Sequence, residues 1–129
     1  AQLEGFAGEL ACRHGSDDTL NSFTRTHEAM MRAYQQGDKP KYFKLNQQIH
    51  DDIVAASGNK HLVEAHRNCS RRLRRIRYIS NLERTAWAQS VSDHEAMLRA
   101  LITRDAETAR RLMTQHAADI WETVRASLA

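Results

Sequence analysis

Apolar residues recur at intervals of three and four along this chain, the spacing that places them on one face of an α-helix. Residues 18–36 show the pattern clearly, with Leu20, Phe23 and Met30 in one stripe. No segment alternates between apolar and polar residues as a half-buried strand would. One proline and five glycines in 129 residues leave room for long helices. The sequence therefore predicts an all-α fold.

Glycines and capping residues divide this pattern into predicted helices. Gly15, Gly37 and Gly58 suit helix ends, whereas Asp38 and Asp105 suit helix starts. Every predicted connection is short, so consecutive helices should pack as antiparallel neighbours within one domain that spans residues 1–129. The predicted helices cover approximately residues 2–14, 18–36, 38–57, 60–80, 83–103 and 105 onward.

Composition favours a cytoplasmic protein without a membrane segment. No apolar run approaches the ~20 residues of a spanning helix, and the N-terminal residues lack a signal-peptide pattern. Cys12 and Cys69 are far apart, as in a protein with reduced thiols. Much of the net charge of +3 lies in the run SRRLRRIR at residues 70–77. Because no aromatic residues interleave it, this run fits a solvated helix face better than a nucleic-acid-binding surface.

Three histidines interrupt the apolar stripes of three different predicted helices. They are His50, His94 and His116, and Asn46 lies one turn before His50 on the same face. Imidazole is the commonest protein ligand for transition metals, and an amide oxygen could add a weaker fourth ligand. The pattern predicts a convergent site for a divalent transition metal such as Zn or Ni, with a position open for water or an anion. The alternative is three core histidines that each have their own hydrogen-bond partner.

Catalytic signatures are weak, which favours binding over turnover. The chain has no H-E-x-x-H motif, no E-x-x-H pair and no G-x-S-x-G elbow. Asp93 and Glu95 flank His94 in sequence but should point away from its face, and His66 should lie near the surface of its helix. We therefore predict that the protein is not an enzyme. A small metalloenzyme and a metal-free helical interaction module remain as alternatives.

Several short segments together resemble the FCD domain, the C-terminal ligand-sensing domain of FadR-type GntR transcription regulators. The resemblance extends over residues 3–124 and implies an antiparallel bundle of six to seven helices that binds a metal and a small organic acid. Metal-binding members use an Asp, a His one turn later, and one His from each of two later helices. These positions correspond to Asn46, His50, His94 and His116, so this chain departs from the family at Asn46. The segments are LNQQIH at residues 45–50, ASGN at 56–59, DHEAML at 93–98 and RDAE at 104–107.

The same resemblance implies an effector pocket and partners. Ser90 matches a position that lines the pocket, and either Arg72 or Arg77 offers a planar fork for a carboxylate. These polar residues favour an acid of a few carbons over a long acyl chain. Such regulators are homodimers that read DNA through an N-terminal winged helix-turn-helix, to which no segment of this chain is similar. We therefore expect an effector-binding and dimerisation domain that reaches DNA only through such an N-terminal domain.

Overall fold

The structure, a computed structural model of the chain, describes residues 2–81 and 84–128 and is all-helical over them. The predicted all-α bundle is confirmed, and the predicted helix ends agree to within one or two residues. Residue 83, the expected start of the fifth helix, lies outside the described residues. The helices are α1 Gln2–His14, α2 Asp17–Gln35, α3 Lys39–Ala56, α4 Lys60–Asn81, α5 Arg84–Ile102 and α6 Ala106–Leu128.

Short polar side chains define where the helices begin. Ser16 Oγ accepts a hydrogen bond from the Thr19 amide at 3.1 Å at the start of α2, and Asn59 Oδ1 accepts one from the Leu62 amide at 3.1 Å at the start of α4. Asp105 caps α6 in the same way. These bonds satisfy amide groups that the first helical turn leaves without partners. The capping residues therefore set where these helices begin.

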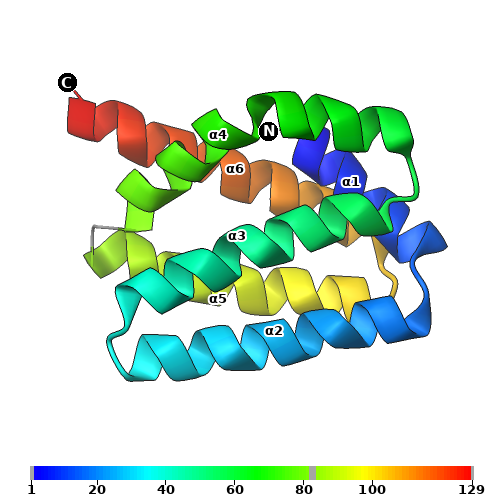
Figure 1. Cartoon of the computed structure of the whole chain (residues 1–129), viewed down its shortest axis with the longest axis horizontal. Coiled ribbons are helices and arrows are strands. Elements are labelled where there is room, and N and C mark those ends of the chain that lie inside the picture. The colour runs from blue at the N-terminus through cyan, green and yellow to red at the C-terminus, as the bar shows by residue number, and fades with distance from the viewer. Residues whose placement is uncertain (1, 82–83, 129) are drawn as a thin grey trace.

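Consecutive helices run in opposite directions, as Figure 1 shows. The first helix packs most extensively against α6, and α2 packs against α3 and α5. As a result α3, α5 and α6 each present one face to the interior, where residues far apart in the sequence meet. Of the helices that the structure describes, none combines the length and the apolar composition needed to cross a bilayer.

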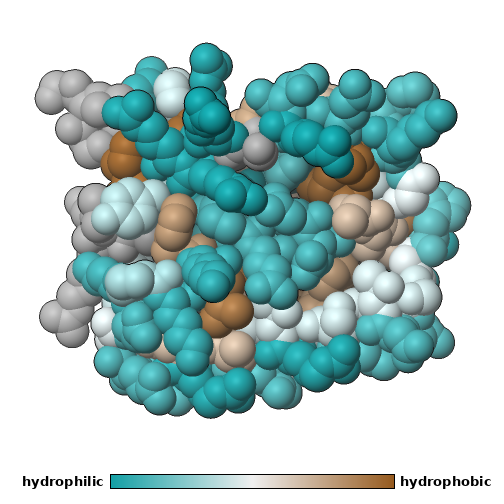
Figure 2. Space-filling model, viewed as in Figure 1, coloured by the Kyte–Doolittle hydropathy of each residue, from teal (hydrophilic) through white to brown (hydrophobic). Residues whose placement is uncertain are grey.

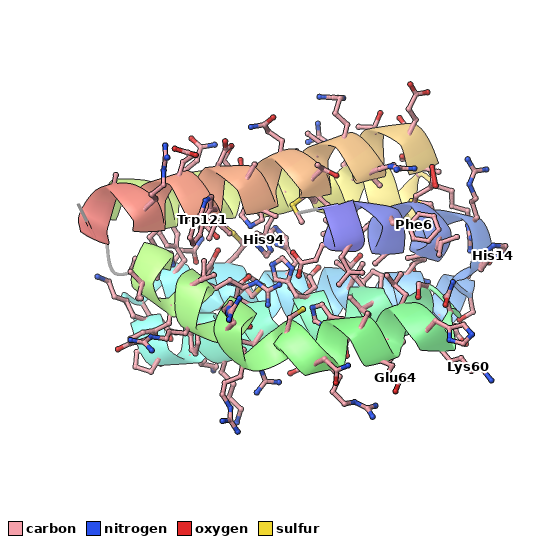
Figure 3. All side chains as sticks on the ribbon, turned by 90° about the horizontal axis from the view of Figure 1, so that it is seen from above. Phe6, His14, Lys60, Glu64, His94 and Trp121 are labelled. Carbon is pink, nitrogen blue, oxygen red and sulfur yellow. The ribbon has the colours of Figure 1, made fainter. Side chains whose placement is uncertain are left out.

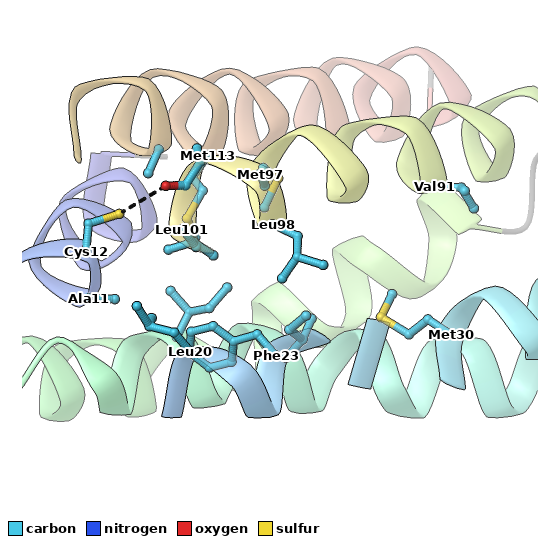
Figure 4. Packing of buried hydrophobic residues seen from close by; sticks show 14 of the residues in the cluster. Ala11, Cys12, Leu20, Phe23, Met30, Val91, Met97, Leu98, Leu101 and Met113 are labelled. Atoms are coloured by element: carbon cyan, nitrogen blue, oxygen red, sulfur yellow. Dashed lines mark hydrogen bonds between the residues drawn. The ribbon is translucent and has the colours of Figure 1, made fainter. Parts of the chain in front are cut away.

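The apolar core contains residues of α1, α2, α3, α5 and α6, and Figure 4 shows part of it. Phe23 and Leu101 are almost completely buried there, and the Cys12 thiol donates a long hydrogen bond of 3.8 Å to the Ala100 carbonyl. The outer surface in Figure 2 is mainly hydrophilic, with separate hydrophobic patches. The bundle thus buries its apolar stripes in the manner that amphipathic helices require.

Candidate metal centre

Three histidine side chains from three helices meet inside the bundle. His50 on α3, His94 on α5 and His116 on α6 expose only 1%, 3% and 3% of their surface, and Figure 3 shows His94 in the interior. The His94 ring centroid lies 5.2 Å from that of His50 and 5.1 Å from that of His116. One nitrogen from each ring lies within 4.8 Å of the other two. The packing of three helices has therefore brought together side chains separated by up to 66 positions in the sequence (116 minus 50).

Burial keeps these imidazoles neutral. Desolvation lowers the pKa of His50 to about 4. Burial also lowers the pKa of His94 well below its ordinary value, and the neighbouring His116 and His50 lower it further. The pKa of His116 is lowered by burial as well, although its hydrogen bond with Asp93 opposes the shift. Neutral imidazole is the form that binds a metal ion, so the cluster is already in the required protonation state.

The donor set suits a cation. The Nε2 atoms of His50, His94 and His116 are buried and have no hydrogen-bond partner among the described residues. The same holds for Oδ1 of Asn46, which lies on α3 one turn before His50 and is 1% exposed. Buried polar atoms without partners are costly. A divalent transition metal would engage three nitrogen lone pairs and one amide oxygen, so the residues fit such an ion.

A carboxylate holds His116 in orientation. Asp93 Oδ2 lies 2.7 Å from His116 Nδ1, and Asp93 Oδ1 accepts a hydrogen bond from Gln89 Nε2 at 2.8 Å. Burial raises the pKa of Asp93, but these two hydrogen bonds outweigh it and leave the pKa lowered. This contact is with His116, so it does not contradict the prediction that Asp93 points away from the His94 face. Asp93 does leave the His94 face of α5, but α6 packs beside that helix and brings His116 to it. An Nδ1–H bonded to a carboxylate leaves Nε2 as the lone-pair donor.

A second buried carboxylate, Glu4, lies beside His50. Its Oε1 is 3.4 Å from His50 Nδ1 and 3.4 Å from His66 Nε2, without hydrogen-bond alignment to either ring. It also accepts a hydrogen bond from Arg77 Nη2. His66 is 4% exposed, so the prediction of a surface position for it is wrong.

Glu4 was not among the predicted site residues, although the sequence contains one signal for it. Glu4 shares the buried stripe of α1 with Ala7 and Ala11, at helical spacings of three and seven. A charged residue inside an apolar stripe is almost never fully buried without a partner. Its presence on that face therefore pointed to a cation in the interior, and that cation is Arg77.

The structure distinguishes the two arginines expected to clamp an effector. Arg77 is only 3% exposed, and its Nη1 donates to Gln47 Oε1 at 2.8 Å. Burial lowers the pKa of Arg77 to about 10, which leaves the guanidinium charged at neutral pH. Arg72 is exposed on α4. Ser90 is buried, and its hydroxyl lies 3.1 Å from the hydroxyl of Tyr42.

A cavity of about 380 Å³ adjoins this network. Its polar lining includes the Glu4–Arg77 pair, and its apolar lining includes Ile76 on α4 with Ala117, Ile120 and Trp121 on α6. Ala117 immediately follows His116, so the cavity reaches the helix that carries one of the three histidines. Figure 3 shows Trp121 on the stretch of α6 beyond the histidine cluster. The volume falls in the range of small-molecule sites.

Fold and site together define an all-helical domain with a buried three-histidine centre beside a partly polar cavity. The FCD domain family model matches residues 1–119 of the chain. The chain therefore belongs to the FCD domain family, the regulatory domains of GntR-type regulators. No curated protein matches it.

Proposed function

We propose that the chain, residues 1–129, is a single effector-binding and dimerisation domain of a GntR-type transcription regulator. In this proposal it binds a small organic acid at a divalent transition metal held by Asn46, His50, His94 and His116. The observation that carries it is the set of buried, neutral imidazoles with Nε2 atoms that have no partner among the described residues. The match to the FCD family supports it independently.

The residues around the centre have separate tasks in this proposal. The bound metal supplies a Lewis-acidic position at which an anion can bind. Asp93 holds His116 with Nε2 directed to the ion, and Arg77 offers a carboxylate the N–H groups that it does not use on Glu4 and Gln47. Ser90, whose hydroxyl contacts that of Tyr42, does not line the cavity that contains Arg77, so it has no assigned contact with the acid. Arg72 is exposed, so Arg77 is the preferred clamp.

The contacts of the two carboxylates near the cluster favour binding without turnover. A general base needs a free lone pair within reach of the proton that it removes. Asp93 is engaged by His116 and Gln89, and Glu4 is engaged by Arg77. Neither is placed as a free base, so we propose that the domain is not an enzyme.

Regulation in this proposal acts through the homodimer and through an N-terminal DNA-binding domain in a whole regulator. An acid that binds one packing arrangement of the helices more tightly than another shifts the population toward it. Acid affinity and DNA affinity would then change each other by the same factor. The match of the chain to the FCD domain family supports this part of the proposal.

Metal analysis of untagged protein, purified without chelator, tests the proposal. Elemental analysis should find up to one equivalent of Zn, Ni or a similar ion per chain. The combined His94→Ala and His116→Ala variant should lose it while remaining helical by circular dichroism. Equal metal content in both proteins would contradict the proposed ligand set. Sedimentation of the same samples tests the homodimer.

A further inference from the structure

The charges buried around the three histidines are almost balanced without any ligand. Glu4 pairs with Arg77, and both are nearly completely buried. Asp93, paired with His116, adds one further negative charge at the edge of the cluster. The imidazoles and Asn46 contribute no charge. A divalent cation on these four side chains would therefore leave about one positive charge uncompensated in a region of low dielectric.

An aspartate at position 46 would remove that excess, and this chain has an asparagine there. The amide can still direct an oxygen toward the ion, because Asn46 Oδ1 is buried and has no partner among the described residues. It cannot neutralise the ion. The missing charge must come from another group, and a bound acid with one carboxylate supplies one negative charge.

The cavity beside the centre indicates what the rest of that acid is like. Of its two carboxylates, Glu4 is paired with Arg77 and Glu122 with Arg125, whose Nη2 lies 2.8 Å from Glu122 Oε2. A second carboxylate on the ligand would therefore meet no spare cation among these residues. The remaining wall includes Ile76, Ile120 and Trp121, which offer apolar surface and no partners for several hydroxyl groups.

We propose that the effector is a monocarboxylic acid with a compact apolar body, and that its carboxylate supplies the charge that Asn46 withholds. This inference rests on the proposed metal site. The carboxylate lies at the Arg77 side of the cavity and the apolar body contacts Ile76, Ile120 and Trp121. Metal and acid then bind cooperatively, because each compensates the charge of the other.

Calorimetric titration of Zn²⁺ with and without a probe acid tests the charge argument. Phenylacetate should tighten Zn²⁺ binding to the wild-type domain by about tenfold or more, within the usual range of coupling between two sites. Asn46→Asp should bind Zn²⁺ more tightly than wild type without acid, yet show coupling to phenylacetate of less than about threefold. Asn68→Asp, the same change at an exposed position of α4, should behave as wild type. Coupling in Asn46→Asp as strong as in wild type would overturn the proposal.

Two further variants keep the test valid if Asn46→Asp folds poorly. Asn46→Ala adds no charge, so it should weaken Zn²⁺ binding but retain the coupling; loss of the coupling here would contradict the charge argument. Trp121→Ala removes an exposed side chain, so it should weaken phenylacetate binding and leave Zn²⁺ affinity without acid unchanged. Unchanged phenylacetate affinity would show that the acid does not bind in this cavity.

Gluconate and succinate test the chemical class. Both should stabilise the Zn²⁺-loaded domain less than phenylacetate, because one has a polar body and the other has a second charge. Stronger stabilisation by either would overturn the assigned class. Failure of the wild-type domain to bind any divalent metal is a different result, since it would remove the proposed metal site itself.

Discussion

The interior of the bundle has two regions of opposite character, both of which include residues of α5 and α6. We call the first the apolar end, formed by Ala11, Leu20, Phe23, Leu101 and Met113. The second is the histidine end, formed by Asn46, His50, His94 and His116. On α6 only three positions separate Met113 from His116, and on α5 seven separate His94 from Leu101.

The contrast separates a region that stabilises the fold from the region that we propose binds a metal. Side chains at the apolar end are closely packed and contribute hydrophobic free energy in proportion to the area they bury. At the histidine end, buried nitrogen and oxygen atoms have no hydrogen-bond partner among the described residues, which disfavours folding. The apolar end must therefore offset the free-energy cost of the histidine end when no ligand is bound there.

Truncation at the apolar end should produce the largest change. Leu101 is 1% exposed, and Leu101→Ala should lower the free energy of unfolding by about 2–5 kcal/mol through lost contacts and a cavity. Urea unfolding of the chelated protein measures this. Ile102→Ala is the control, since Ile102 is 42% exposed. Similar losses from both substitutions would show that the apolar end is not the stabilising region.

Metal binding should offset the free-energy cost of the buried polar atoms at the histidine end. Zn²⁺ at about 100 times its dissociation constant should raise the free energy of unfolding by about 2.7 kcal/mol, because it binds the folded state. Leu101→Ala should gain the same increment while it stays folded, since the two regions are separate. The combined His94→Ala and His116→Ala variant should gain none. An increment that survives in that variant would place the ion elsewhere.

The orientation of His116 by Asp93 should have a smaller effect. Asp93→Asn should weaken Zn²⁺ binding by about 10–100-fold, as loss of a carboxylate behind a metal-binding histidine usually does. Glu95→Gln, an exposed charge removal on the same helix, is the matched control. Calorimetric titration compares the two, and equal affinities would mean that the hydrogen bond to His116 has no part in metal binding.

The smallest effect concerns His27, a buried histidine of α2. Burial lowers its pKa below the ordinary value of 6.5, although Glu95 and Glu28 oppose the shift. The unfolded state therefore binds more protons, so the stability from His27 is present above pH 6.5 and is lost as the pH falls below it. In chelated protein, His27→Gln should show less loss of stability than wild type between ~pH 7.5 and ~pH 5.5. Parallel pH profiles would contradict this.

Much of the fold was predictable because local rules act strongly here. Gly37 adopts a positive φ of 69° directly after α2, and Ser16 and Asp105 cap helices as their positions indicate. The three histidines were predictable as a group for the same reason. A residue at helical spacing inside an apolar stripe must face the interior, whichever neighbour it meets there.

The sequence by itself determined the all-α fold, the helix ends and the inward faces that carry Asn46, His50, His94 and His116. Only the tertiary structure decided which charged side chains accompany them. Arg77 rather than Arg72 is buried, Glu4 pairs with it from 73 positions away, and Asp93 reaches His116 on the next helix. The physical reason is that helical periodicity specifies a direction within one helix. Ion pairs between helices depend on rotation and offset, which packing of the whole bundle sets.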